Sequence, residues 1–239
     1  LIEGAADADL YLLPELFTTG YAHDAWAAAA RDETPGALAA LQRVADARGA
    51  WIAGSAIAQR DDGALVNRLH VLAPGAATPV AVYDKAHLFA PMGEPERLGA
   101  GDRRVRVALG APEARADAAL SICFDLRFPE QYRRDAVDGA ALFVVVSEWP
   151  HPRSETLRLL ARARAAENQA WLLLCNRTGP ARDGTAFCGG SCAVSPTGEV
   201  VVDAGEAEGV VTAEVDVAAA ERLRRTFPVL GLRRERIDW

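Results

Sequence analysis

The sequence lacks the features that mark several specialised classes of protein. None of its four cysteines stands in a CxxC pair, which argues against a zinc site or a thioredoxin-like redox site. No apolar run approaches the roughly 20 residues of a membrane-spanning helix, and no segment resembles a signal peptide. A net charge of -7 argues against nucleic acid or an anionic membrane as a partner. We therefore expect a protein of the reducing cytoplasm with free thiols.

Apolar runs and helical spacing alternate along the chain. Short apolar runs between turn residues predict strands at 9–13, 51–58, 64–72, 80–84, 105–109, 118–123, 140–146, 171–175, 190–194, 200–202 and 210–215. Apolar residues at helical spacing predict helices at 35–48, 129–137, 154–169 and 217–225. No linker, low-complexity segment or repeat interrupts this order. The pattern predicts an α/β fold with a mixed sheet or two sheets covered by helices, and one domain over residues 1–239.

Three reactive side chains stand where predicted strands end. Glu15 follows the first strand, Lys85 follows the fourth, and Cys123 closes the strand at 118–123. Strand ends in one sheet can converge, and a buried glutamate and lysine would compensate each other's charge. A helix beginning at Pro129 should present its positive end to the thiol and lower the pKa of Cys123. The alternative is that Cys123 is only a small buried apolar residue.

Three sequence blocks, in this order, resemble the signatures of the nitrilase superfamily of carbon–nitrogen hydrolases. They are PELFTTGY at 14–21, YDKAHLF at 83–89 and CFDLRFPE at 123–130. Later segments resemble further blocks of the same family: EWP at 148–150, RARAAEN at 162–168 and CNRTG at 175–179. The resemblance covers nearly the whole chain. Of the family's pattern, only the first strand has no counterpart in this sequence. We therefore expect that strand to be missing, with residues 1–6 as the tail of the helix that follows it.

The resemblance implies a four-layer α-β-β-α sandwich and a catalytic triad of Glu15, Lys85 and Cys123. It also implies a second glutamate in the loop after the lysine. Glu94 is the better match, because Gly101 then closes the loop, and Glu96 is the alternative. In this family neither a metal nor an organic cofactor is needed. The family usually forms homodimers through helices beside the site and an extended C-terminal tail.

Within the superfamily, the blocks look most like the ω-amidase branch, which hydrolyses ω-amides of dicarboxylic acids such as 2-oxoglutaramate. The backbone N–H of Phe124 would then help to bind the oxyanion, and Trp149 would wall the pocket or simply pack. A cation must hold the distal carboxylate of such a substrate. The candidates are Arg153, Arg127 and Arg177. Arg127 could instead form a structural ion pair with Asp125 or Glu130.

Other functions stay open at this point. The chain could hydrolyse an N-carbamoyl amino acid, a deaminated-glutathione-type amide or a nitrile, or it could be an inactive remnant. A Cys–His nucleophilic pair with His87 or His151 is a further alternative. The resemblance gives the role of base to a glutamate, so we expect His87 to be a packed or hydrogen-bonded loop residue. Cys175, Cys188 and Cys192 are expected to be structural.

Overall fold

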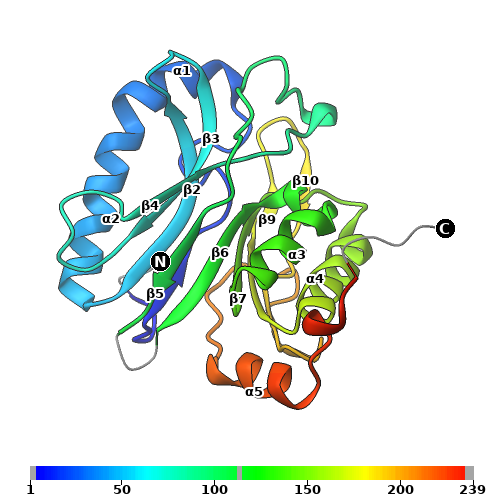
Figure 1. The fold of residues 1–239 in the computed structure, drawn as a ribbon. Helices are drawn as coiled ribbons and strands as arrows, with labels where there is room; N and C mark the ends of the chain where they lie inside the picture. Colours follow the sequence, from blue (N-terminus) through cyan, green and yellow to red (C-terminus); the bar gives the residue numbers. More distant parts are fainter. Residues whose placement is uncertain (1–3, 112–114, 235–239) are drawn as a thin grey trace.

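The computed structural model describes residues 4–111 and 115–234. Half of the predicted helix tail at residues 1–6 and the last residues of the C-terminal tail therefore lie outside the described residues. Two main β-sheets form the centre of the molecule (Figure 1). One has four strands in the order β1-β2-β3-β4: Leu10–Leu12, Trp51–Gln59, Leu65–Leu72 and Ala81–Asp84.

The larger sheet has six strands in the order β12-β11-β8-β7-β6-β5. Their bounds, in that order, are Val200–Asp203, Cys192–Val194, Trp171–Asn176, Leu142–Ser147, Ala116–Ile122 and Arg106–Leu109. The three central strands β6, β7 and β8 are parallel to one another, and the outer pairs are antiparallel. The predicted mixed sheet is therefore confirmed. Parallel strands end at one edge of a sheet, and that edge carries Cys123.

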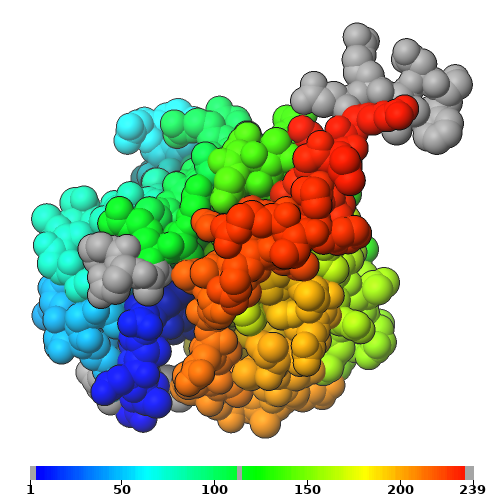
Figure 2. Space-filling view, turned by 60° about the horizontal axis from the view of Figure 1, so that its bottom comes forward, coloured from blue at the N-terminus to red at the C-terminus, as the bar shows by residue number. Residues whose placement is uncertain are grey.

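Helices cover the outer face of each sheet, which gives the predicted α-β-β-α layering (Figure 1). Helix α2, Thr34–Arg48, packs on the four-stranded sheet, whereas α3, Pro129–Val137, and α4, Ser154–Asn168, pack on the six-stranded sheet. Helix α5, Ala218–Thr226, lies on the surface of the molecule (Figure 2). Arg224 attaches α5 to the domain, because its guanidinium donates to the backbone carbonyls of Ala140 and Asn168. Within residues 4–111 and 115–234, none of the helices combines the length and the apolar composition of a membrane-spanning helix.

The two sheets share one hydrophobic core. Every residue of β7 is buried, as expected for a central strand of apolar residues covered on both faces. Leu69 and Val71 of the smaller sheet belong to the same buried cluster as Leu120 and Ile122 of the larger one. Burying each such side chain stabilises the fold by about 1.5–3 kcal/mol relative to exposure. Packing of the inner faces therefore fixes the strand ends of one sheet against those of the other.

Most predicted elements are confirmed with boundaries shifted by one or two residues, but some predictions were wrong. The expected strand at 210–215 is not formed, and Val210 and Val211 are largely exposed to solvent. Among the described residues, no backbone hydrogen bond joins this stretch to a neighbouring strand, and an apolar run alone does not make a strand. Prediction also missed the short hairpin of β9, Thr178–Pro180, with β10, Ala186–Cys188, and the helical turns at 23–33.

Candidate active site

A lysine and two glutamates form a fully buried cluster where the two sheets meet. The Lys85 Nζ lies 2.8 Å from the Glu15 Oε1 and 2.8 Å from the Glu94 Oε2. All three side chains have an exposed fraction of 0%. Glu15 comes from the turn after β1, Lys85 follows β4 directly, and Glu94 lies in the loop that follows. The structure thus brings together three of the four residues predicted to be catalytic, from segments up to 79 positions apart by sequence number (Glu15 to Glu94).

The fold of the loop after Lys85 explains why Glu94, and not Glu96, belongs to the cluster. The Glu94 Oε2 accepts a hydrogen bond of 2.6 Å from the backbone N–H of Phe89, whereas Glu96 is exposed. The loop returns at Gly101, whose N–H donates to the carbonyl of Lys85 at 2.8 Å. A Cβ at Gly101 would lie 2.0 Å from the carbonyl oxygen of Asp84, so only glycine allows this approach.

Further donors orient the two carboxylates. The Asn67 Nδ2 donates to the Glu15 Oε1 at 2.8 Å, and the Tyr21 hydroxyl donates to the Glu94 Oε1 at 3.0 Å. The second oxygen of Glu15 accepts the backbone N–H of Glu148 at 2.8 Å. Sequence reasoning missed Asn67 and Tyr21. A polar residue inside the apolar strand at 64–72 was the available signal for Asn67, and Tyr21 closes a block that carries the family resemblance.

Charge balance sets the protonation of the cluster. Burial by itself lowers the pKa of Lys85, but the carboxylates of Glu15 and Glu94 outweigh burial and raise that pKa above its ordinary value. Lys85 is therefore a permanent cation at neutral pH. Burial, together with the charges of Glu15 and Glu94, also raises the pKa of Tyr21 well above its ordinary value, so its hydroxyl stays protonated and remains a donor.

Cys123 stands at the end of β6, at the start of a 3₁₀ turn over Cys123–Arg127 that leads into α3. Its side chain is buried, and its pKa responds to the charges of Glu15 and Lys85, which places the thiol beside the cluster. The prediction of a lowered pKa was wrong. Burial, followed by the negative charge of Glu15, raises the pKa of Cys123 well above its ordinary value, although Lys85 opposes this. The 3₁₀ turn also separates the thiol from helix α3, whose positive end was expected to lower the pKa of Cys123.

Aromatic side chains and two exposed arginines contact one another near the residues that follow Cys123 in the sequence. Phe124 contacts Phe89, with ring centroids 5.0 Å apart, and the guanidinium of Arg153 lies 5.8 Å from the centre of the Phe89 ring. The Arg127 guanidinium lies 5.1 Å from the ring of Trp149, which is buried and donates its Nε1–H to the carbonyl of Arg153. Within residues 4–111 and 115–234, neither Arg127 nor Arg153 forms an ion pair. The alternative, a structural ion pair of Arg127 with Asp125 or Glu130, is therefore not found there.

Arg177 differs from the other two arginines because it has a carboxylate partner. Its Nη1 lies 2.9 Å from the Glu148 Oε1. Burial, then the nearby charge of Glu15, raises the pKa of Glu148 to about 8 even though Arg177 acts in the opposite direction. Gly20 packs against this pair, since a Cβ there would lie 2.5 Å from the Arg177 Nη1. Of the three predicted carboxylate-binding arginines, Arg177 is the one whose guanidinium is already engaged by a carboxyl group of the protein.

The two histidines considered as partners of the thiol lie elsewhere. The His87 Nδ1 is 2.8 Å from the Asp125 Oδ1, and its ring stacks on Phe128 with centroids 3.6 Å apart. The His151 Nε2 is 3.8 Å from a carboxylate oxygen of Glu206. His87 is thus a packed and hydrogen-bonded loop residue, as predicted. All four cysteines are free of disulfides.

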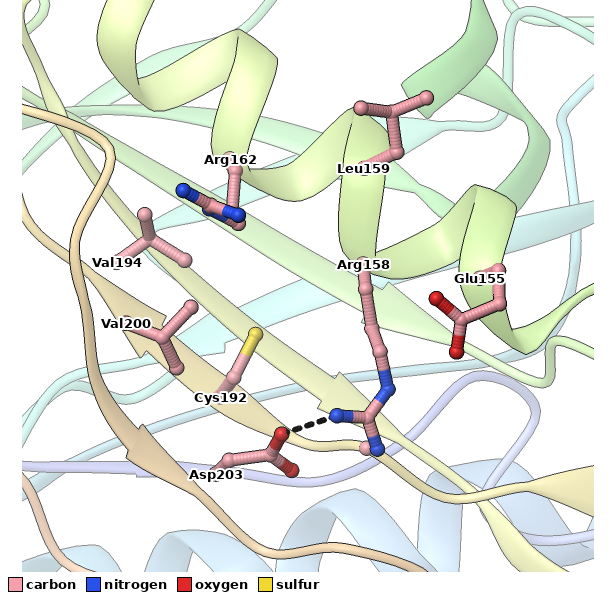
Figure 3. A pocket seen from close by; sticks show the side chains of 9 residues that line it. Glu155, Arg158, Leu159, Arg162, Cys192, Val194, Val200 and Asp203 are labelled. Atoms are coloured by element: carbon pink, nitrogen blue, oxygen red, sulfur yellow. Dashed lines mark hydrogen bonds and ion pairs between the residues drawn. The ribbon is translucent and has the colours of Figure 1, made fainter.

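The described part of the chain holds no group of three or more His, Cys, Asp or Glu side chains arranged to hold a metal ion. A separate surface pocket of about 300 Å³ lies between α4 and the strands β11 and β12 (Figure 3). Arg158, Cys192 and Asp203 are among its lining residues. None of the clustered residues Glu15, Lys85, Glu94 or Cys123 lines it.

Comparisons with known proteins agree with this geometry. The family described as Carbon-nitrogen hydrolase matches residues 1–225. The chain is 36% identical over 239 residues to a protein named 2-oxoglutaramate amidase of Paenarthrobacter nicotinovorans, a match that covers 98% of this chain and 81% of that protein. It is also 36% identical to a protein of Escherichia coli K12 named Omega-amidase YafV, over 95% of this chain and 85% of that protein.

Among solved structures, the fold is similar to that of a CN-hydrolase superfamily protein from Xanthomonas campestris, which carries an arsenic adduct in its active site. The TM-score is 0.88 and the sequence identity is 31%, with 100% of this chain and 89% of that chain covered.

Proposed function

Because the chain belongs to the carbon–nitrogen hydrolase family, we propose that it is an amidase that hydrolyses the terminal amide of a dicarboxylic or 2-oxo dicarboxylic acid to a carboxylate and ammonia. One structural observation carries the chemistry: a permanently charged lysine is held between two buried glutamates beside a cysteine. The names of the relatives, 2-oxoglutaramate amidase and ω-amidase, support the substrate class.

In the proposed mechanism, Glu15 is the base. The raised pKa of Cys123 means that its thiol is protonated at rest, so a base must remove the proton as the sulfur attacks. The proton moves from sulfur to a carboxylate oxygen of Glu15 while the S–C bond forms at the amide carbonyl. Glu15 then donates that proton to the amide nitrogen, the C–N bond breaks, and ammonia leaves a thioester on Cys123. Water, deprotonated by Glu15, attacks the thioester and releases the acid, and the sulfur regains its proton.

Two donors would stabilise the negative oxygen of the tetrahedral intermediate. One is the ammonium of Lys85, whose charge is fixed by Glu15 and Glu94. The other is the backbone N–H of Phe124, in the first turn of a 3₁₀ helix, where N–H groups have no acceptor within the helix. Each donor of this kind contributes about 2.7–4 kcal/mol in comparable acyl-transfer sites. Glu94 would keep Lys85 charged and in place.

The distal carboxylate of the substrate requires a cation that the protein leaves unpaired. Arg153 meets this condition, and it lies one aromatic ring away from Phe124, the neighbour of the nucleophile. Arg127 over Trp149 is the second candidate. Arg177 fits less well because its guanidinium already donates to the carboxyl group of Glu148. We propose Arg153 as the first candidate for binding the carboxylate.

We also propose a homodimer and a cytoplasmic location, which light scattering and cell fractionation would test.

Trapping the acyl-enzyme by mass spectrometry tests the function directly. The wild-type protein is mixed with a short series of amides, quenched in acid and digested, and ammonia release is measured in parallel. We expect ammonia from ω-amides that carry a distal carboxylate, and an acyl mass increase on the peptide that contains Cys123. The Cys123→Ala variant is the matched control and should show neither. An adduct on another cysteine, or release of ammonia by Cys123→Ala, would refute the mechanism.

A further inference from the structure

The backbone of the proposed nucleophile is strained. Cys123 has a φ of +47°, in the left-handed region that residues with a Cβ rarely adopt. Such a conformation costs of the order of 1–3 kcal/mol and persists only where neighbouring contacts enforce it. One contact closes directly over the cysteine: the N–H of Ile122 donates to the Asp125 Oδ2 at 2.9 Å. The side chain of Asp125 thus spans the strained residue.

The same carboxylate also holds the segment that carries the catalytic lysine. The Tyr83 hydroxyl donates to the Asp125 Oδ2 at 2.7 Å, and the backbone N–H of His87 donates to the Oδ1 at 3.0 Å. The His87 Nδ1 lies 2.8 Å from that Oδ1. Tyr83 and His87 flank Lys85 on either side in the sequence. Asp125 is completely buried, and each of its oxygens has two partners.

We propose that Asp125 is a positioning residue for the reaction. Its carboxylate ties the cysteine turn to the Tyr83–His87 segment, and so sets where the sulfur of Cys123 lies relative to the ammonium of Lys85. The effect of Asp125 on catalysis rests on the proposed function, whereas its positioning of the two segments does not. In this arrangement His87 serves as a donor to Asp125, and its stacking on Phe128 holds the donor in place.

Only a carboxylate satisfies all of these contacts. Tyr83, Ile122 and the backbone of His87 all present hydrogen atoms, so the group between them must accept on both oxygens. An asparagine has the same shape but turns an NH₂ group toward two of these donors. Asp125→Asn should therefore release either the cysteine turn or the lysine segment while leaving the core packing unchanged.

The experiment compares Asp125→Asn with Asp135→Asn. Asp135 is also a buried acid, on α3, but it pairs with Arg104 and bridges no catalytic segments. We expect Asp125→Asn to lower kcat about 100-fold with little change in KM, the size of loss that a displacement of about 1 Å can cause. Asp135→Asn should keep kcat within about threefold, because this substitution should affect only the stability of the fold.

A second readout does not depend on any substrate. The rate of alkylation of Cys123 by iodoacetamide is followed against pH. In Asp125→Asn the midpoint should move down toward about 8.5, the value of an ordinary thiol, because the sulfur leaves the burial and the carboxylate that raise its pKa. The profile of Asp135→Asn should superimpose on that of the wild type. If the wild type hydrolyses no amide, the proposed function fails, but the alkylation profiles still decide the role of Asp125.

A milder pair of variants covers the case in which Asp125→Asn does not fold. Tyr83→Phe removes one of the donors to Asp125, whereas Tyr132→Phe removes an equally buried hydroxyl that pairs with Ser121. Tyr83→Phe should lower kcat about tenfold at unchanged KM, a loss of one hydrogen bond to a charged group, and Tyr132→Phe should not. The proposal is overturned if Asp125→Asn, or Tyr83→Phe in its place, keeps the wild-type kcat and alkylation profile.

Discussion

Two cysteines of the six-stranded sheet differ in their surroundings: Cys123, the proposed nucleophile, and Cys192, which we expect to be structural. Cys192 begins β11 and lines an open pocket, beside the ion pair of Arg158 with Asp203 (Figure 3). Burial, and then the charge of Asp203, raises the pKa of Cys192 to about 12. Cys123 also has a raised pKa but lies beside a cluster that holds both a base and a cation.

The two thiols differ in the charges near them. At the Cys192 pocket the acid and the arginine are partly exposed and neutralise each other, so neither is available to a reacting group. At Cys123 one lysine is shared by two glutamates, so an ammonium and a carboxylate remain next to the sulfur without solvent. We therefore expect catalysis at Cys123 and not at the pocket that holds Cys192, and the following variants test this contrast.

Removal of each thiol should give the largest difference. Cys123→Ala should lower ammonia release at least 10⁴-fold, because no other group can form the acyl-enzyme, the scale seen when other nucleophiles are removed. Cys192→Ala should keep turnover within about twofold. Steady-state ammonia assays on the two purified variants measure this, with the melting temperature as a check of folding. Comparable losses in both variants would show that the two thiols are not distinct.

Removal of each cation comes next. Lys85→Met should lower kcat by about 10²–10³, the usual loss for one oxyanion donor. It should also destabilise the fold by about 3–5 kcal/mol, because Glu15 and Glu94 are left buried without the cation that balances their charge. Arg158→Met, at the partly exposed pair with Asp203, should cost at most about 1 kcal/mol. Urea unfolding of both variants decides between these values.

The pH dependence of stability separates the two regions further. In the unfolded chain Glu148 titrates near 4.5, and in the folded protein its pKa is about 8. Between these values the folded state binds the extra proton, so the free energy of unfolding should fall as pH rises. Glu148→Gln should remove this decline, which amounts to a few kcal/mol at about 1.4 kcal/mol per unit of pKa.

Glu155→Gln, which changes an exposed acid of the surface pocket, is the matched control. Its urea midpoints between pH 5 and pH 8 should run parallel to those of the wild type. If the Glu148→Gln curve also runs parallel, the buried carboxyl does not carry the effect.

The smallest effect concerns substrate binding. Arg153→Ala should raise KM about tenfold for an ω-amide with a distal carboxylate, the loss of one charge-assisted contact of about 1.4 kcal/mol. For a neutral amide of the same length KM should hardly change, and kcat should be similar in both cases. Arg127→Ala, tested with the same two substrates, identifies the arginine that binds the carboxylate. An unchanged KM in both variants would place the carboxylate elsewhere.

Much of this arrangement could be predicted from the sequence. Continuous apolar runs predicted the central strands, since only strands covered on both faces are apolar throughout, as β7 is. Family resemblance, more than spacing, indicated that Glu15, Lys85 and Cys123 act together. The residues around them were harder to find, because Asn67 contacts Glu15 across a sheet and 52 positions apart.

The backbone geometry of Cys123 and the effect of the charges around its thiol could not be predicted from the sequence. The positive φ of Cys123 could not be predicted, because residues with a Cβ avoid that region and no local pattern marks the exception. The pKa of its thiol was predicted in the wrong direction, because burial and Glu15 outweigh any helix terminus. The stretch 210–215 has the pattern of a strand, yet pairing depends on a neighbour that a local pattern does not reveal.

The permanent charge of Lys85 has a consequence for the lifetime of the enzyme. An amine next to a thioester normally captures the acyl group, since transfer from sulfur to nitrogen gives the more stable amide. That transfer requires a free electron pair on nitrogen. In the proposed mechanism Glu15 has passed on its proton by the time the thioester is formed, so both carboxylates then hold the proton on Lys85. If Lys85 acts as proposed, the carboxylates that keep it charged also protect it from acylation by the thioester.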